Sequence, residues 1–192
     1  MLTAGLANTQ SDLRQILALQ ERNLKQNLSA EEKAAEGFLT MQFSLEMLQQ
    51  LHDLAPSVVV RDGNDIIAYA IVLLKEGRNA YPDLENMFLH LETLSWNGRP
   101  LIDYKFYVMG QVCIDKNYRG QQVFNMLYNK HRELYQNSFD CIVTEISTSN
   151  HRSLRAHEKT GFQTIHKYRD YMDEWNVVLW QWDVKRIMSY EI

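Results

Sequence analysis

The residues that decide the fold run from Gly110 to Phe162 and read GQVCIDKNYRGQQVFNMLYNKHRELYQNSFDCIVTEISTSNHRSLRAHEKTGF. An apolar run around Cys113 is followed by a turn that carries Arg119 and Gly120, and then by a helical pattern. A second apolar run begins at Cys141 and leads into a second helical pattern. The order is strand, basic glycine turn, helix, strand, helix, and it can place two helix N-termini beside one anionic ligand.

The remaining elements are predicted from capping residues and apolar periodicity. Thr9, Ser29 and Ser44 precede helical patterns, and the turn DGND at 62–65 joins two β-branched runs as in a hairpin. Strands are expected at 2–7, 57–61, 66–74, 104–115, 141–146, 162–168 and 176–183, and helices beginning near 10 and 30 and spanning 45–53, 121–137 and 150–160. Residues 75–101 are expected to form a long connection with one or two helical turns, either functional or an apolar flap, and 184–192 carry little signal.

The composition indicates one domain spanning residues 1–192. The chain has 192 residues, 45% of them apolar, which is enough for one full hydrophobic core. Its net charge is −4 without a block of like charge, so binding to nucleic acid is not expected. Neither a basic leader nor a run of about 18 apolar residues is present, so we expect a cytoplasmic protein without a membrane partner.

The cysteines and histidines do not predict a metal site. Cys113 and Cys141 lie in apolar runs, where a free cysteine is usually a small buried hydrophobe. The histidines are scattered without metal-ligand spacing. Cys113 is not expected to act as a nucleophile, because its neighbours Val112 and Ile114 indicate burial rather than activation by a cation.

Two segments resemble a known family. In the first, Ile114 to Phe124, the Arg119-Gly120 pair opens a strand-to-helix turn, although Gln122 and Phe124 stand where the family pattern R/Q-x-x-G-x-G/A has small residues. The second segment, Asn150 to Phe162, is similar to N-x-x-A-x-x-x-Y-x-K-x-G-F, with Ser153 in place of Ala and His157 in place of Tyr. Both patterns belong to the GNAT superfamily of acyl-CoA-dependent N-acetyltransferases. The resemblance implies an α/β fold of the mixed α+β kind, with a central, mostly antiparallel sheet that holds two splayed parallel strands and is flanked by helices.

The same resemblance implies a site for acetyl-CoA. The pantetheine arm would run beside one strand, the pyrophosphate would sit on backbone amides of the glycine turn, and two residues would approach from the second helix. In this sequence the strand residues are Val112, Cys113 and Ile114, the turn residues are Arg119, Gly120, Gln121, Gln122, Val123 and Phe124, and the helix residues are Asn150 and Ser153. Arg119 and Arg155 could pair with phosphates, or could be solvated surface arginines.

Glu145 is the candidate general base. It lies on a strand that is otherwise apolar, and partial burial would raise the pKa of its carboxyl toward a useful range. The strand end Thr144-Glu145-Ile146 also resembles the Leu-Glu-Val of many GNAT members, in which this glutamate is the base. A solvent-facing or salt-bridged strand glutamate is the alternative.

His157 stands where the family has its general acid. It could protonate the departing thiolate, hydrogen-bond the sulfur, or simply pack in the structure, and solvent could supply the proton instead.

The sequence therefore predicts transfer of an acetyl group from acetyl-CoA to a primary amine of a small molecule or peptide. The alternative, favoured by Gln122, Phe124 and His157, is a catalytically weak or inactive module that binds or senses acyl-CoA. The acceptor is not identified, although the acids Asp83, Glu85 and Glu92 could attract a cationic amine or form a solvated loop. A homodimer is left open.

Overall fold

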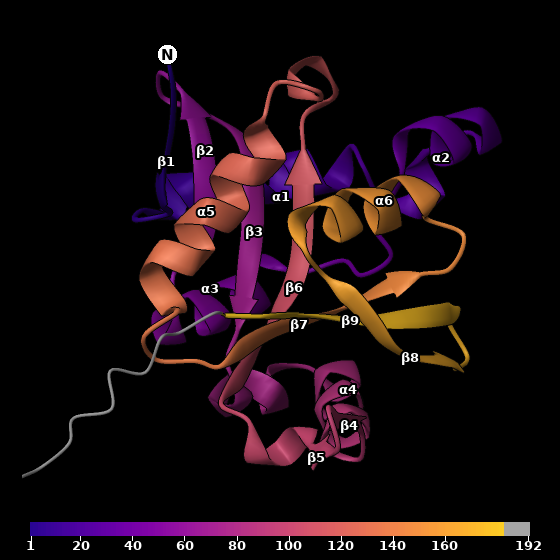
Figure 1. Cartoon of the computed structure of the whole chain (residues 1–192). Helices are drawn as coiled ribbons and strands as arrows, with labels where there is room; N and C mark the ends of the chain where they lie inside the picture. Colours follow the sequence, from indigo (N-terminus) through magenta and orange to yellow (C-terminus); the bar gives the residue numbers. More distant parts are fainter. Residues whose placement is uncertain (183–192) are drawn as a thin grey trace, which may run out of the picture.

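The computed structural model describes residues 1–182, in which a seven-stranded sheet lies between two groups of helices (Figure 1). The strand order is β1-β2-β3-β6-β7-β9-β8, and every neighbouring pair is antiparallel except β6 and β7. The strands are β1 Leu2–Leu6, β2 Val58–Asp62, β3 Asp65–Leu73, β6 Phe106–Ile114, β7 Cys141–Ser147, β8 Gln163–Arg169 and β9 Glu174–Gln181, with β4 Ser95–Trp96 and β5 Arg99–Pro100 as a separate ribbon. The predicted fold class is confirmed.

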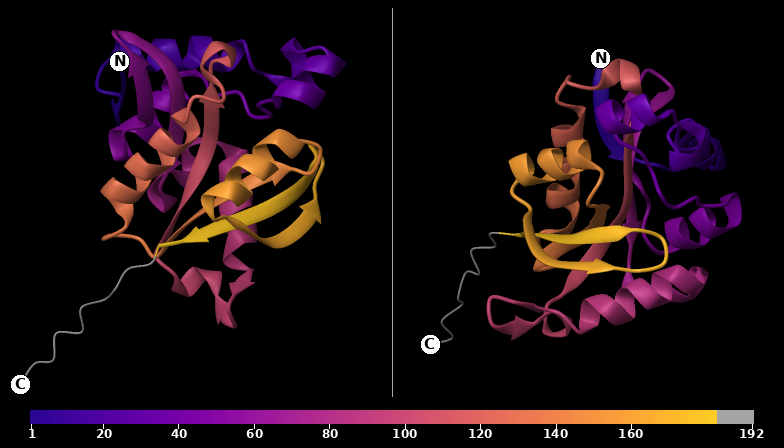
Figure 2. Two further views of the ribbon diagram at one scale, coloured as in Figure 1. Left: turned by 45° about the horizontal axis from the view of Figure 1, so that its top comes forward. Right: turned by 90° about the vertical axis from the view of Figure 1, so that its right-hand side faces the viewer.

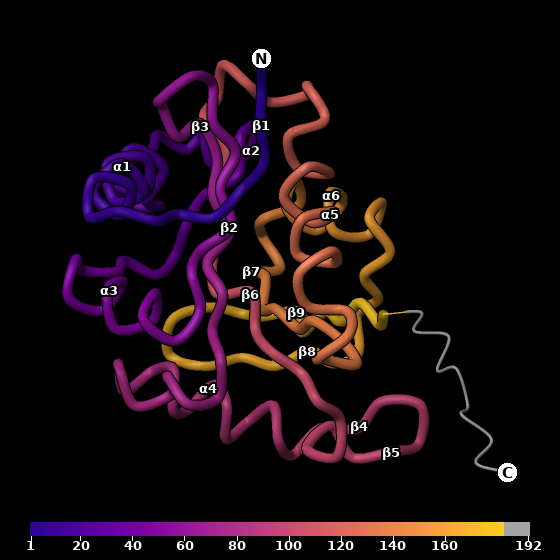
Figure 3. The backbone as a smooth tube through the Cα atoms, turned by 90° about the vertical axis from the view of Figure 1, so that its left-hand side faces the viewer, coloured from indigo at the N-terminus to yellow at the C-terminus, as the bar shows by residue number. Residues whose placement is uncertain are grey.

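The helices cover both faces of the sheet (Figure 3). One apolar cluster joins α1, α3 and α4 to one face, and a second joins α5 and α6 to the other. The helices are α1 Gln10–Glu21, α2 Ala30–Glu36, α3 Leu45–Leu54, α4 Pro82–Glu92, α5 Val123–Tyr135 and α6 His151–Thr160. Because both faces are covered, residues 66–73 of the interior strand β3 are all buried, which explains their unbroken apolar run.

The first three helices begin at the residues that the sequence indicates. The side chains of Thr9, Ser29 and Ser44 each accept a hydrogen bond from the backbone N–H three residues later. These bonds satisfy amides that have no partner within the helix, so the chain direction at each start is set locally.

The prediction for residues 75–101 was wrong in its helix content. The segment forms a 3-10 turn, Lys75–Ala80, then the 11-residue helix α4, then the β4–β5 ribbon. Pro82 at the start of α4 and the acids in its first turn are helix-start signals, while Phe88 and Leu91 share a buried stripe. The aromatic and proline content of the segment hid this periodicity.

The other expected elements are present, and their ends differ from the prediction by one or two residues. The helix expected at 121–137 is α5, which starts at Val123 because Gln122 takes a left-handed conformation with φ of 65°. The strand expected at 176–183 runs to Gln181, and residue 183 and the tail 184–192 lie outside the described residues.

The two parallel strands separate after a short pairing. β6 and β7 are in register at Phe106–Cys141, Tyr107–Ile142 and Val108–Val143. Beyond that point β6 continues beside β3 and β7 continues beside β9. The edge of β6 that faces β7 therefore has no strand partner from residue 109 onward.

Gly110 lies at an irregularity in β6 just after the separation. The pairing with β3 shifts register between Ile71 and Val72, which leaves Gly110 as the extra residue of a bulge. A Cβ on Gly110 would lie 2.5 Å from Cδ1 and 2.6 Å from Cγ of Leu73, which is buried in the core. Only glycine fits here without a shift in the packing.

We expect Gly110→Ala to lower the free energy of unfolding by about 1–3 kcal/mol, the usual cost of overpacking a core. Gly5→Ala is the matched control, because a Cβ on Gly5 would meet nothing within 4 Å. Urea unfolding followed by circular dichroism compares the two. Equal stability of both variants would show that the bulge tolerates a side chain.

Candidate functional site

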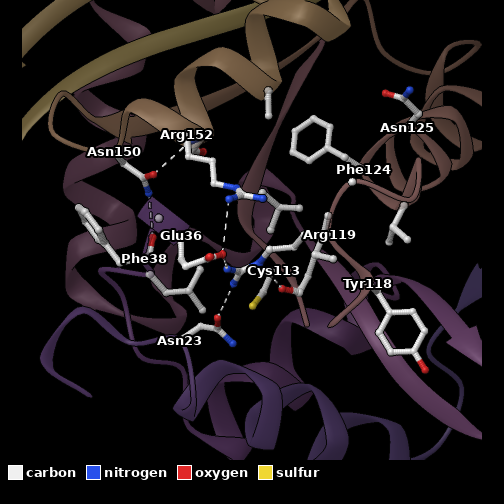
Figure 4. A pocket seen from close by; sticks show the side chains of 18 of the residues that line it. Asn23, Glu36, Phe38, Cys113, Tyr118, Arg119, Phe124, Asn125, Asn150 and Arg152 are labelled. Atoms are coloured by element: carbon white, nitrogen blue, oxygen red, sulfur yellow. Dashed lines mark hydrogen bonds and ion pairs between the residues drawn. The ribbon is translucent and has the colours of Figure 1, made fainter. Parts of the chain in front are cut away.

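A cavity of about 360 Å³ opens between the end of β6 and the starts of α5 and α6 (Figure 4). We call it the α5–α6 cavity. Residues predicted to bind the cofactor that line it are Val112, Cys113, Ile114, Arg119, Gly120, Gln122, Val123, Phe124, Asn150 and Ser153. Gln121 is the exception, because its amide turns away and donates to the carbonyl of Asn117 at 2.9 Å.

The first turn of α5 faces this cavity without a side-chain cap. Gln122 is the N-cap residue, yet its side chain makes no capping hydrogen bond. Its Oε1 instead accepts from Nδ2 of Asn125 at 2.6 Å, so the side chain lies along the helix. The backbone N–H groups at such a helix start carry partial positive charge and are suited to an anion.

The second large side chain at this turn, Phe124, packs against residues of α5 and α6. Its ring packs edge-on against His157 at a centroid distance of 5.0 Å and tilted against Tyr128 at 4.8 Å. The two departures from the small-residue pattern of the turn, Gln122 and Phe124, thus each contact a neighbouring side chain at the wall of the cavity.

Two arginines converge on one carboxylate in the α5–α6 cavity (Figure 4). Arg119 forms an ion pair with Glu36 and donates to Asn23 at 2.8 Å and to the carbonyl of Ile114 at 3.1 Å. Arg152 lies 3.4 Å from the same Glu36 carboxylate. The cavity thus contains a compact cationic centre whose charge is countered by a side chain of α2.

Arg152 was not foreseen, and Arg155, which was, does not line the cavity. Arg152, Ala156 and Lys159 all line it at helical spacing, and this periodicity could have identified the cavity-facing side of α6. No local signal marks Glu36, because it is far from both arginines in the sequence.

A second cavity of about 350 Å³ lies on the α4 side of the splayed strands. We call it the α4–β7 cavity. It contains Glu145 and His157, and it shares lining residues with the first cavity, so the two adjoin. The shared residues are Phe38, Leu39, Val112, Asn150 and Ser153.

The segment 37–43, which we call the strap, runs between the two cavities and is held by long-range hydrogen bonds. Asn150 donates to the carbonyl of Phe38 at 2.9 Å, and Gln111 donates to the carbonyl of Met41 at 2.6 Å. The strap is thereby tied to both α6 and β6.

The carboxylate of Glu145 lies in a largely apolar environment. Its Oε1 is shielded from solvent and has no hydrogen-bond partner. Burial raises the pKa of Glu145 to about 7, while a hydrogen bond from Tyr168 lowers it and the nearby charge of Asp170 raises it. The group is therefore balanced between its two protonation states near neutral pH.

Both ring nitrogens of His157 have protein partners. Nδ1 lies 2.8 Å from the carbonyl oxygen of Ser153, and Nε2 lies 2.6 Å from the hydroxyl of Tyr128. Because a carbonyl only accepts, Nδ1 carries the proton and Nε2 accepts from the tyrosine. Burial lowers the pKa of His157 to about 4, so the ring is neutral at pH 7. Of the roles open to it, packing fits this environment best.

The environment of Cys113 favours its protonated thiol. It is buried, and burial raises its pKa to about 12. A protonated thiol is a poor nucleophile.

The acids of the 75–101 segment separate into two groups. Glu85 and Glu92 bind Arg78 at 2.7 and 3.0 Å and are not available to a ligand. Asp83, at the start of α4, lines the α4–β7 cavity and accepts a hydrogen bond from Tyr171 at 2.6 Å.

Within residues 1–182, no group of three or more His, Cys, Asp or Glu side chains is placed to hold a metal ion. None of the helices in this part of the chain combines the length and apolarity that crossing a membrane requires.

We expect Tyr128→Phe to lower the free energy of unfolding by about 1–3 kcal/mol, because it leaves Nε2 of the buried His157 without a donor. Tyr135→Phe on the same helix is the control, because its hydroxyl makes no hydrogen bond within residues 1–182. Chemical denaturation of both variants measures the difference. A loss no larger than that of the control would contradict the structural role of the Tyr128–His157 pair.

The family model and the solved structures that match this chain agree with one another. The family model described as Acetyltransferase (GNAT) family matches residues 19–162, whereas no protein of curated function matches the sequence. The ribosomal-protein-S18-alanine N-acetyltransferase of Escherichia coli has a similar structure, with a TM-score of 0.65, 12% identity and 99% of each chain covered. A chain of the NatC complex bound to Gag peptide and CoA has a TM-score of 0.62 and 11% identity, covering 94% of this chain and 98% of that one. The yncA protein of Salmonella typhimurium, solved with acetyl-CoA, has a TM-score of 0.60 and 12% identity, covering 95% and 94%.

Proposed function

The chain belongs to the GNAT acetyltransferase family, and from this premise we propose that it transfers an acetyl group from acetyl-CoA to a primary amine. The observation that carries the proposal is the meeting of two different cavities at the gap between β6 and β7. One offers helix amides and arginines, and the other offers a buried carboxylate with a pKa near 7.

The α5–α6 cavity is the proposed site for the phosphates and the pantetheine arm of coenzyme A. The uncapped amides of α5, with Arg119 and Arg152, suit the phosphates. Beyond Val108 the free edge of β6 offers backbone groups to the pantetheine amides, as in strand addition. The cosubstrate supplies an activated thioester, and these residues of the chain bind and orient it.

Glu145 is proposed as the base. An amine attacks a thioester only as the free base, whereas an alkyl ammonium has a pKa near ~10, so a proton must be removed. The carboxylate of Glu145, with a pKa of about 7, accepts this proton directly or through a water molecule. Its unpartnered Oε1 has a free position for the bond.

Solvent is proposed as the source of the proton for the departing thiolate. His157 stands at the family position of the acid, but both of its nitrogens are engaged and burial keeps it neutral. This assignment leaves His157 as a residue that positions Ser153 and Tyr128.

The assay for the proposed function mixes protein, acetyl-CoA and a panel of amines, and follows free thiol. Sustained release of thiol above the rate in buffer supports the enzyme. Tight binding of coenzyme A without turnover of any amine supports instead a module that binds or senses acyl-CoA.

We expect Glu145→Gln to lower kcat by about 100-fold or more with little change in the Kd for coenzyme A, because a missing general base affects the chemical step. Glu133→Gln, on the exposed side of α5, is the control. In the wild type, kcat/KM should rise with pH through about 7, since Glu145 must be ionised. Unchanged turnover in Glu145→Gln would remove this residue from the mechanism.

The same substitution should stabilise the protein at high pH. Folding raises the pKa of Glu145 from 4.5 to about 7, so stability is fully present below pH 4.5 and is lost as the pH rises through 7. Glu145→Gln avoids this cost, on the order of 1–3 kcal/mol at pH 8. Thermal unfolding of both proteins at pH 4 and pH 8 measures it, and an equal difference at both values would contradict the buried ionisation.

A further inference from the structure

The α4–β7 cavity is lined by acids and by no arginine or lysine among residues 1–182. The acids are Asp83, Glu145 and Asp170, and the charge of Asp170 raises the pKa of Glu145. Like charges that face one cavity without a cation are costly, and a bound ammonium relieves the cost.

Three buried polar atoms beside this cavity have no partner in the described part of the chain. They are Oε1 of Glu145, Nε2 of His90 and Nε1 of Trp175. Buried polar atoms are normally hydrogen-bonded, and unsatisfied groups gathered at one cavity indicate a place where a ligand or water completes them.

Beside polar residues such as Asn86, Gln111 and Ser147, the wall carries aromatic and thioether side chains that accept flat or branched groups. The residues concerned are Phe38, Met41, Met87, Tyr168 and Met172. A volume of about 350 Å³ suits a small molecule or a single side chain.

The strap offers an extended peptide few backbone partners. The carbonyls of Phe38, Leu39 and Met41 on the strap already accept from Asn150, from Lys25 and from Gln111. Strand-like binding of a peptide requires free main-chain groups.

The turn between β8 and β9 also restricts this cavity, since it lies beside α4 (Figure 2). Tyr171 in this turn donates to Asp83 at the start of α4, and both residues line the cavity. This hydrogen bond joins two walls of the cavity, and the walls would have to separate to admit a long polypeptide.

Resting on the proposed function, we propose that the acceptor is a small primary amine whose only charge is its ammonium and whose stem is apolar and large enough for an aromatic ring. A carboxylate on the acceptor would be repelled by the acids of the cavity. A second ammonium group would lose its hydration against the apolar side chains of the wall.

The test compares 2-phenylethylamine with phenylalanine, spermidine and a short peptide with a free N-terminus, in the thiol-release assay. The expected result is a kcat/KM for 2-phenylethylamine at least tenfold above the other three. A higher value for phenylalanine, spermidine or the peptide overturns the inference and leaves the transferase intact. Binding of coenzyme A without turnover of any of the four contradicts the proposed function as well.

A variant tests the role of charge in this preference. Asp83→Asn keeps an acceptor for Tyr171 but removes the negative charge, and should raise KM for 2-phenylethylamine about three- to tenfold with the Kd for coenzyme A unchanged. Asp53→Asn, on α3, is the control. A KM for Asp83→Asn equal to that of the control overturns the electrostatic part of the inference.

A different observation supports a second inference, about the α5–α6 cavity. Glu36 is the last residue of α2, and its carboxylate contacts both Arg119 and Arg152. Gly37 follows with φ of 76°, and a Cβ there would lie 2.8 Å from Oδ1 of Asn150. The Glu36 carboxylate therefore lies beside Arg119 and Arg152, the cations that the phosphates of coenzyme A would use.

A carboxylate and a phosphate oxygen have the same partners on a guanidinium group, so the two compete. We infer that Glu36 is an internal competitor, and that it leaves Arg119 and Arg152 when coenzyme A binds. Its position at the end of a short helix and before a glycine allows this change without disturbing the sheet.

Isothermal titration with coenzyme A tests this inference in Glu36→Gln, with Glu31→Gln on the same helix as the control. Removal of the competing charge should lower the Kd about three- to tenfold, and the control should match the wild type. A Kd in Glu36→Gln equal to or weaker than that of the wild type overturns the inference. Absence of binding in all three proteins contradicts the proposed function instead.

Discussion

The short parallel pairing of β6 and β7 is the constraint on which the site depends. Three residue pairs hold the strands together, after which each strand follows its other neighbour. The bulge at Gly110 lies just past this point, where contact with Leu73 leaves no room for a side chain. This separation leaves the edge of β6 without a strand partner and with space beside it, because β7 no longer forms hydrogen bonds with it.

Charge is distributed unequally on the two sides of that gap. The side of α5 and α6 carries an uncapped helix start and two arginines, which favour an anion. The side of α4 carries Asp83, Glu145 and Asp170, which favour a cation. The strap separates these environments and is tied to α6 and β6. Two substrates of opposite charge can thus approach one point from opposite sides, which supports direct transfer between them.

Local signals in the sequence were sufficient for most of the fold. Capping residues such as Thr9 and Ser44, the hairpin turn and the apolar runs each act over a few residues, so their elements are readily predicted. The splayed strands came from the family resemblance. The helix content around α4 was underestimated, because its start signal, Pro82, lies in a segment rich in aromatic and turn-forming residues.

The site was predictable only in part, for a physical reason. The strand and turn residues that line the α5–α6 cavity follow from motif position, but the partners of those residues do not. Glu36 meets Arg119 across 83 residues of sequence, and Tyr128 meets His157 across 29. Such contacts depend on how the helices pack on the sheet, and the periodicity of a single sequence does not specify that packing. The hydrogen bonds of His157 could therefore be identified only in the structure.

A structure determined with coenzyme A bound tests the central claim most directly. We expect the diphosphate on the first-turn amides of α5 and the pantetheine arm along the free edge of β6, beside Val112 and Ile114. Coenzyme A bound elsewhere on the protein, with the gap between β6 and β7 unchanged and empty of it, would contradict the account.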